Sequence, residues 1–472
     1  MNPWQGATDS SNLFSFVSES VAGWHRFTKS LDLATDSIEI GNDVFKRFKD
    51  NNGEGEFKGE INSDVEGLLS LFEASYLGFE DENVLEEARK FSKTHLIKNL
   101  FKQGANNITN KVTHALELPY HRRVHRLEAR WFIQNFQEKQ PQDRVLLQLA
   151  KLDFNIVQSL MKKELQEILR WWMEIGLSKK MDFARDRLME VYFWAIGMVP
   201  DPQLSHCRKF VTKMFGLVTI IDDVYDVYAT LPELQLFTHA VQSWDVNAVN
   251  TLPDYMKLIF LALFNSVNDM AYITLRENGH NCLPHLAKSW CELCKAFLQE
   301  ATWCNNKIIP PFDAYLQNAS ISSSGGALLA PCYFLLARSQ PAAMDDSITS
   351  NYLVHSSCTI FRLYNDLATS TAEVERGETT NSIVSYMNEN NNGKCEEHEA
   401  REKLKELIEK EWKKMNGECA RVTLLPAAFK EIAINMARVS QCTYQYGDAL
   451  GRPDDSARNR INLLLLQPIP IT

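Results

Sequence analysis

Two stretches of oxygen-bearing side chains lie about 140 residues apart and are the clearest sign of chemistry in the chain. The first is a DDxxD pattern whose outer carboxylates, Asp222 and Asp226, project from one face if the stretch is helical, because positions i and i+4 are neighbours on an α-helix. In the second, Asn365, Thr369 and Glu373 recur every fourth residue and form a column of three oxygen donors. Such hard oxygen ligands suit Mg²⁺, which often bridges to a substrate phosphate, and they do not exclude Mn²⁺. We therefore predict a Mg²⁺ site built from both stretches.

The alternative is that each stretch is an ordinary solvated acidic face, which is the commoner role of a single acidic pair on a helix. Residues 215–221 (FGLVTII), just ahead of the first stretch, are almost all apolar, and a similar run, residues 357–361 (SCTIF), precedes the second. These runs indicate buried helices, where an unpaired carboxylate is very costly. Two acidic sets that both continue buried helices favour bound cations over solvated faces.

Composition indicates a large helical enzyme. The chain has 472 residues, a net charge of −10 and a pI near 5.7, and it lacks the basic stripe that a nucleic-acid partner requires. No run of about 18 unbroken apolar residues is present, so we expect no membrane span. Apolar residues recur every three or four positions in many segments while strand patterns are scarce, which predicts an all-α fold. The polar stretch 137–144 (QEKQPQDR) divides the chain into a shorter front part and a longer remainder.

Several runs match a known family: residues 182–194 (DFARDRLMEVYFW), 221–226 (IDDVYD), 252–257 (LPDYMK), 362–367 (RLYNDL) and 444–448 (YQYGD). From about residue 43 onward, the chain resembles the plant class I terpene synthases, most closely the angiosperm monoterpene synthases. The resemblance implies two helical domains. We predict a smaller N-terminal helical barrel in residues 1–146 and a C-terminal class I terpenoid synthase α-bundle in residues 147–472, which carries the metal site.

The resemblance also implies the reaction, which is that of a carbon–oxygen lyase acting on a prenyl diphosphate. Three Mg²⁺ ions, held by the two ligand stretches, and several arginines would neutralise the charge that builds on the departing diphosphate. The expected substrate is geranyl diphosphate, and the expected product is a monoterpene. A chain-elongating prenyltransferase would need a second DDxxD motif, which the stretch beginning at Asn365 does not provide.

Three arginines are candidates for binding the diphosphate: Arg185, Arg187 and Arg362. A guanidinium is always charged, and its planar fork of donors matches phosphate oxygens. The alternative is pairing with a neighbouring acid, such as Asp186 or Glu190. The resemblance favours diphosphate binding, because the arginines of the family that bind diphosphate occupy these positions.

Other residues are expected to border the substrate's hydrocarbon chain. Trp194 is a candidate pocket wall, because an indole face attracts a cation, although packing in the core beside Phe193 is the alternative. Tyr444 and Asp448 match a pair that the family places at the wall or mouth of the pocket. Residues 322–326 (SSSGG) predict a broken or kinked helix, since paired glycines and serines interrupt helices.

The front of the chain departs from the family pattern. A tandem-arginine motif, RR followed by eight residues and Trp, is not found, and Arg122-Arg123 is a decoy with seven residues before Trp131. Members without this motif tend to form acyclic products, so the expectation is a product of the linalool, myrcene or ocimene type. A cyclic product of the limonene type, a sesquiterpene from farnesyl diphosphate, and a truncated non-catalytic protein are the alternatives.

The compartment is predicted in two ways that disagree. The resemblance implies a plastid protein. Residues 1–40 contain acidic residues and little arginine, unlike a transit peptide, so a chain that is complete as given would be cytosolic. No oligomeric state can be predicted from these patterns.

Overall fold

In the computed structural model, the described residues are 59–101, 107–136, 141–181, 183–337, 351–375, 380–390, 395–421 and 425–471. These ranges contain helices and turns and no strand, which confirms the predicted all-α fold. The predictions that concern residues 1–40 lie outside the described residues.

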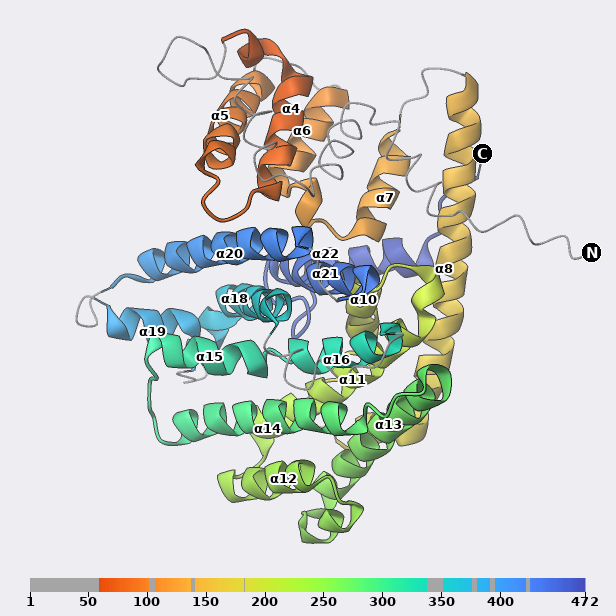
Figure 1. The fold of residues 1–472 in the computed structure, drawn as a ribbon, viewed down its shortest axis with the longest axis vertical. Coiled ribbons are helices and arrows are strands. Elements are labelled where there is room, and N and C mark those ends of the chain that lie inside the picture. The colour runs from red at the N-terminus through yellow and green to blue at the C-terminus, as the bar shows by residue number, and fades with distance from the viewer. Residues whose placement is uncertain are drawn as a thin grey trace, which may run out of the picture.

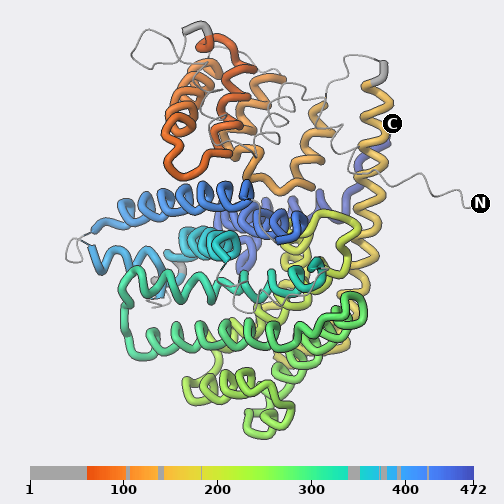
Figure 2. Tube along the Cα trace, viewed as in Figure 1, coloured from red at the N-terminus to blue at the C-terminus, as the bar shows by residue number. Residues whose placement is uncertain are grey.

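The front part of the chain forms a small group of helices with its own core. Figures 1 and 2 show this group at one end of the molecule, above α20. Leu68 and Phe72 of the first helix pack there with Leu96 and Val112 of the next two. The helices are α4 (Val65–Ala74), α5 (Asn83–Leu100) and α6 (Asn107–Glu117), whereas the next helix, α7 (His125–Asn135), contributes Ile133 to the larger core.

The remainder forms a larger bundle around one continuous core. Its central helix, α18, packs against α20, α21, α15 and α16, while α10 packs against both α11 and α21. The helices are α8 (Pro141–Ile175), α9 (Leu177–Lys180), α10 (Leu188–Met198), α11 (Ser205–Asp223), α12 (Leu231–Ser243), α13 (Asp254–Asn278), α14 (Leu283–Asn305), α15 (Phe312–Ser322), α16 (Gly325–Leu336), α18 (Tyr352–Glu375), α19 (Ser382–Glu389), α20 (Glu397–Ala420), α21 (Ala427–Tyr444) and α22 (Asp455–Ile461).

Polar contacts join the front helices to α20. Glu409 of α20 accepts hydrogen bonds from both terminal nitrogens of Arg122 and also pairs with Arg89 of α5. Asn416, two turns further along α20, donates to the carbonyls of Tyr76 and Gly78, both at 3.0 Å. Arg122 therefore joins the two parts of the chain. This structural role fits its interpretation as an arginine that does not belong to a tandem-arginine motif.

The predicted division at residue 146 falls inside α8, which runs without a break from Pro141 to Ile175. The N-terminal half of this helix contacts α7, and its C-terminal half contacts α11. The helix is thus a shared structural element, and the boundary remains a prediction.

The predicted kink in the SSSGG stretch is present between α15 and α16. The two helices meet at 44°, and Ser324 adopts a left-handed φ of 68°. A Cβ on Gly325 would lie 2.6 Å from Cys358 Sγ and 2.7 Å from Met436 Cε, so only glycine allows this close approach to α18 and α21. The break is therefore pressed against the helix that carries the second ligand stretch.

One described helix, α13, is long and apolar enough to cross a membrane by length and composition. It packs within the bundle against α11, α12, α14 and α16. These contacts are those of a core helix in a globular domain.

Candidate active site

The first ligand stretch lies at the end of a buried helix. Residues before Asp222 on α11, including Leu217 and Ile221, are fully buried, and the α-helix ends at Asp223. Residues Val224–Tyr228 continue as a π-helical turn that contains Asp226. The straight α-helical register predicted for the two outer carboxylates is therefore wrong, because the wider turn begins between them. Single π-turns of this kind are frequent at functional sites.

Arg185 bridges the two carboxylates that end α11. Its Nη2 donates to Asp222 Oδ2 at 2.9 Å, and its Nε donates to Asp223 Oδ1 at 2.7 Å. Asp223 also accepts the backbone N–H of Arg185 at 2.7 Å. Burial raises the pKa of Asp222, and the charge of Arg185 opposes that rise. Since about a third of the Asp222 side chain is exposed, at 34%, this carboxylate can still meet a cation.

The second ligand stretch lies on one uninterrupted helix, as its spacing predicted. Asn365, Thr369 and Glu373 all belong to α18, one turn apart from each other. The Thr369 hydroxyl donates to the Asn365 carbonyl at 3.0 Å, which leaves the lone pairs of its oxygen for a cation. Glu373 accepts a hydrogen bond from Asn381 Nδ2 at 2.7 Å, which orients its carboxylate.

These donors fit Mg²⁺. All five predicted ligands offer oxygen, and they come from two helices rather than from a closed cage. In the described part of the chain, no three His, Cys, Asp or Glu side chains form a ready-made metal cluster. An ion held on only one or two protein ligands keeps coordination positions for water or substrate phosphate, which is how Mg²⁺ usually binds.

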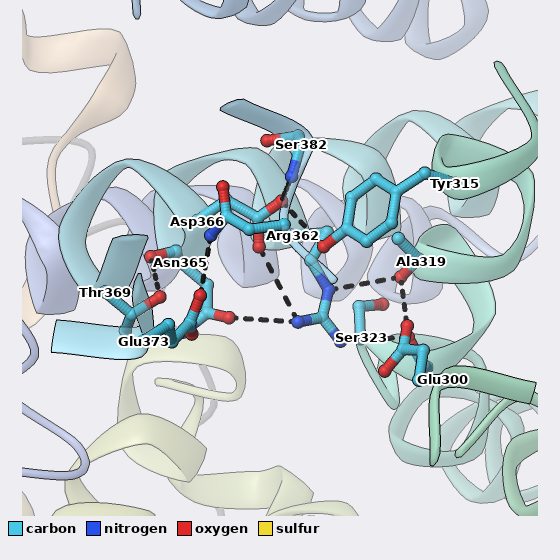
Figure 3. Close-up of polar contacts among 12 residues, drawn as sticks. Glu300, Tyr315, Ala319, Ser323, Arg362, Asn365, Asp366, Thr369, Glu373 and Ser382 are labelled. Carbon is cyan, nitrogen blue, oxygen red and sulfur yellow. Dashed lines mark hydrogen bonds and ion pairs between the residues drawn. The ribbon is translucent and has the colours of Figure 1, made fainter. Parts of the chain in front are cut away.

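Arg362 lies between the second ligand stretch and the break of α15 and α16 (Figure 3). Its Nη1 donates to Asn365 Oδ1 at 3.2 Å, and its Nη2 donates to Ser322 Oγ at 2.9 Å. Its Nε reaches the Ala319 carbonyl at 3.4 Å. The charge of Arg362 also opposes the rise in the pKa of Asp222, so the two ligand stretches share one electrostatic environment.

Two residues that sequence reasoning missed hold this region in place. Asp366 is 1% exposed, lies 3.7 Å from Arg362, and accepts hydrogen bonds from Tyr315 at 2.9 Å and from the Ser382 N–H at 3.1 Å. Tyr315 is fully buried on α15. The position of Asp366 directly after Asn365 was a signal for the aspartate, but no pattern indicated the tyrosine.

A third missed residue, Glu300, comes from α14. Its Oε1 accepts hydrogen bonds from Ser322 Oγ at 2.5 Å and from Asn318 Nδ2 at 3.1 Å. Burial raises the pKa of Glu300, and the nearby Arg362 opposes the rise. Nothing around Glu300 in the sequence distinguishes it from a surface glutamate.

Arg187 and Asp448 meet at one loop. Arg187 Nη2 donates to the Gly451 carbonyl at 2.9 Å, and Asp448 Oδ1 accepts the Gly451 N–H at 2.7 Å. A Cβ on Gly451 would lie 3.3 Å from Arg185 Nη1, so the loop also borders the carboxylates of α11. The structure thus places both predicted residues beside the first ligand stretch.

Four aromatic rings pack together between α11 and α18. Ring centroids of Trp194 lie 5.2 Å from Phe215, 4.7 Å from Phe361 and 6.1 Å from Tyr444. Phe215 and Phe361 lie 6.3 Å apart, as do Phe361 and Tyr444. The predicted residues Trp194 and Tyr444 are thus brought together, and sequence reasoning missed the two phenylalanines. We call these four residues the aromatic cluster.

Tyr444 links the aromatic cluster to the charged groups. Burial raises its pKa well above the usual value, and Asp448 adds to the rise while Arg362 and Arg185 oppose it. The phenol therefore keeps its proton at neutral pH. Trp194 is fully buried, and its indole N–H has no hydrogen-bond partner among the residues that the structure describes.

Comparison with known proteins agrees with this geometry. The profile described as "Terpene synthase family, metal binding domain" matches residues 173–414, and that of "Terpene synthase, N-terminal domain" matches residues 33–116. A chloroplastic isoprene synthase of Pueraria montana var. lobata is 66% identical over 440 residues, which cover 92% of this chain and 72% of that protein. A chloroplastic tricyclene synthase of Medicago truncatula is 48% identical, over 96% of this chain and 78% of that protein.

A solved structure is similar over nearly the whole chain. It is isoprene synthase from grey poplar leaves (Populus x canescens) in complex with three Mg²⁺ ions and dimethylallyl-S-thiolodiphosphate. The TM-score is 0.86 at 44% identity, and the match covers 96% of this chain and 88% of that chain.

An all-helical fold with candidate oxygen ligands at the end of α11 and on α18, three arginines and an aromatic cluster fits a class I enzyme that ionises a diphosphate ester. The chain belongs to the terpene synthase family. It is therefore a carbon–oxygen lyase acting on phosphates, with the metal-binding domain of that family. These findings confirm the predicted fold class and the resemblance to plant terpene synthases.

Proposed function

We propose that this chain converts dimethylallyl diphosphate to isoprene and inorganic diphosphate. The observation that carries the proposal is the position of the aromatic cluster relative to the metal ligands. The 66% identity to an isoprene synthase and the dimethylallyl analogue bound to the poplar relative support the same substrate.

The cluster limits how far a substrate chain can extend from the diphosphate. Phe361 lies four residues before Asn365 on α18, which is about 6 Å along the helix axis. Phe215 lies seven residues before Asp222 on α11, about 10 Å along that axis. From these separations we infer that the site is matched to a five-carbon allylic group, and that a ten-carbon group would require the rings to move or the chain to fold back.

The chain's own residues then have these roles. Asp222 and Asp226 on one side, and Asn365, Thr369 and Glu373 on the other, would hold Mg²⁺ against the diphosphate. When bound, Mg²⁺ supplies the positive charge that stabilises the departing diphosphate. Arg185, Arg187 and Arg362 orient the diphosphate oxygens, because guanidinium groups keep their charge and offer paired donors.

Breaking the C–O bond leaves an allylic cation beside the aromatic cluster. The indole face of Trp194 stabilises it by about 0.5–2 kcal/mol, and the buried rings exclude water that would capture it as an alcohol. Loss of a proton from a methyl carbon completes the second double bond. Tyr444 keeps its own proton, so it offers no base, and the proton passes to the departing diphosphate.

Geranyl diphosphate is the second candidate substrate, giving the acyclic monoterpene that the sequence predicted. The 48% identity to a tricyclene synthase supports a monoterpene product, and because tricyclene is cyclic, this relative favours the cyclic alternative over the acyclic one. No observation on the described residues favours the sesquiterpene or the non-catalytic alternative.

We place the protein in the plastid, because both relatives described above are chloroplastic. A fluorescent fusion to the full chain, imaged in leaf cells, tests this placement. Diffuse cytosolic fluorescence would contradict it.

The experiment for the activity is headspace gas chromatography of the purified chain with Mg²⁺ and, separately, each of the two diphosphates. Isoprene from dimethylallyl diphosphate, lost on addition of EDTA, supports the proposal. Myrcene, ocimene or linalool as the dominant product at equal substrate concentration would replace it with the second candidate.

A further inference from the structure

Glu300 belongs to neither ligand stretch, yet it lies at the edge of the site. It comes from α14, near the C-terminal end of that helix, and Figure 3 shows it beside Arg362 on the side opposite Asn365 and Glu373. A carboxylate in protein surroundings needs hydrogen-bond donors, and Glu300 receives hydrogen bonds from Ser322 and Asn318 of α15. Glu300 thus fixes the last turn of α15, just before the break.

Ser322 links Arg362 to Glu300 through two hydrogen bonds that both donate in the same direction. Its hydroxyl has a single hydrogen, which it donates to Glu300, and its oxygen accepts the Nη2–H of Arg362. Ser322 is 3% exposed, so no bulk water can replace either partner. Arg362 thus donates to Ser322 and Ser322 donates to Glu300, and these two hydrogen bonds join α18, α15 and α14.

Arg362 in turn is shared between the break and the second ligand stretch. Its Nη2 and Nε point to α15, while its Nη1 reaches Asn365. If Ser322 lost its acceptor, its hydroxyl could turn and withdraw its lone pair from Arg362. On the α15 side the guanidinium would then keep only the longer 3.4 Å contact of its Nε with the Ala319 carbonyl, and its orientation toward the ligands would be less fixed.

We infer that Glu300 is a positioning residue for diphosphate binding, which acts through Ser322 to hold Arg362 in the orientation that meets the diphosphate oxygens. The inference rests on the proposed diphosphate chemistry and adds to it a residue outside both motifs. The competing explanation is that Glu300 only ties α14 to α15, in which case its loss affects stability and not the action of Arg362.

The test is a double-mutant cycle read by calorimetric binding of inorganic diphosphate in the presence of Mg²⁺. Glu300→Ala should weaken binding roughly tenfold, as expected for loss of one charge-assisted link. In an Arg362→Gln background, the same substitution should change binding by less than about twofold, because the guanidinium through which Glu300 acts on the diphosphate is absent. Glu292→Ala, on the same helix and outside the site, is the matched control and should leave binding unchanged.

The outcomes separate the two proposals. If the wild-type chain does not bind Mg²⁺ and diphosphate, the proposed function fails. If it binds and Glu300→Ala has no effect, or has the same effect with and without Arg362, the inference is overturned.

Two further variants guard against loss of folding. Ser322→Ala breaks the same link with a small change in volume, so it should match Glu300→Ala in binding and should also lose its effect beside Arg362→Gln. Glu300→Gln keeps an acceptor oxygen and should restore most of the affinity. A thermal midpoint close to that of the wild type in these variants, together with unchanged diphosphate affinity in Ser322→Ala, would refute the positioning role.

Discussion

The rings of Phe215 and Phe361 meet at a centroid distance of 6.3 Å between α11 and α18, the two helices that carry the predicted metal ligands. Each ring therefore lies on the same helix as one half of the ligand set. We therefore expect these two helices to position both ends of the substrate, with the diphosphate at the ligands and the hydrocarbon at the rings. The helical rise sets how far each ring lies from the ligands along its helix, so we expect ring size to control the length of the hydrocarbon chain that is accepted.

Truncating Phe361 should lengthen the accepted substrate. We expect Phe361→Ala to raise kcat/KM for geranyl diphosphate, relative to kcat/KM for dimethylallyl diphosphate, by roughly tenfold or more. Removing the buried ring frees the volume of several methylene groups of a longer substrate. The same change should lower the free energy of unfolding by about 3–5 kcal/mol. Steady-state kinetics with both substrates and denaturant unfolding measure the two effects.

The control is Phe429→Ala, which removes a fully buried ring that contacts Tyr333 rather than the aromatic cluster. It should cost similar stability and leave the substrate ratio unchanged. Equal substrate ratios in both variants would show that the aromatic cluster does not set chain length.

Activity should depend on the carboxylate of Asp222. Asp222→Ala leaves Arg185 paired with Asp223, so the fold should survive, whereas kcat should fall roughly 100- to 1,000-fold because an electrostatic contact to the transition state is lost. Turnover against Mg²⁺ concentration, with and without EDTA, measures the effect. Asp254→Ala, which removes an exposed carboxylate paired only with Lys257, should retain full activity. Undiminished turnover of Asp222→Ala would rule out its metal role.

The contact between the two parts of the chain should depend on Glu409. Its removal leaves the buried guanidinium of Arg122 without its carboxylate, and we expect Glu409→Ala to cost about 3 kcal/mol of unfolding free energy. Urea denaturation followed by circular dichroism measures this cost. Glu406→Ala on the exposed face of α20 should change stability by less than about 0.5 kcal/mol. A similar small effect at Glu409 would contradict the assigned role.

Acid should weaken the same contact through His121. Burial lowers the pKa of His121 to about 3, with Arg438 adding to the effect, and its ring bonds Asn416 at 2.8 Å. The unfolded chain takes up this proton below about pH 6.5, while the folded chain does so only near pH 3, so stability declines as pH falls through that window. Thermal midpoints between pH 7 and pH 5 should fall less steeply in His121→Gln. Equal slopes in the two proteins would exclude His121 as a source of the acid sensitivity.

The sequence predicted what depends on local spacing. The i, i+4, i+8 column from Asn365 holds because α18 is one continuous helix, and the SSSGG stretch broke the helix where serine and glycine compete with helical backbone. The π-turn after Asp223 was not predicted, because a widened turn keeps the same residue spacing and is selected by tertiary contacts.

Other features depend on contacts between distant segments. Glu300 meets Ser322 and Ser322 meets Arg362 only after three helices pack, so no motif includes them together. The same holds for Phe215 and Phe361, which looked like ordinary core residues in two apolar runs. The acyclic product was predicted from the missing tandem-arginine motif near the N-terminus, where residues 1–58 lie outside the described residues, and it remains a prediction.

The measurement that tests the account most directly is the ratio of kcat/KM for dimethylallyl diphosphate over geranyl diphosphate in the purified wild-type chain with saturating Mg²⁺. If the aromatic cluster sets substrate length, the ratio should exceed roughly ten, with isoprene as the only volatile product. A ratio below one, with a ten-carbon product dominant, would contradict the proposed function and favour a monoterpene synthase.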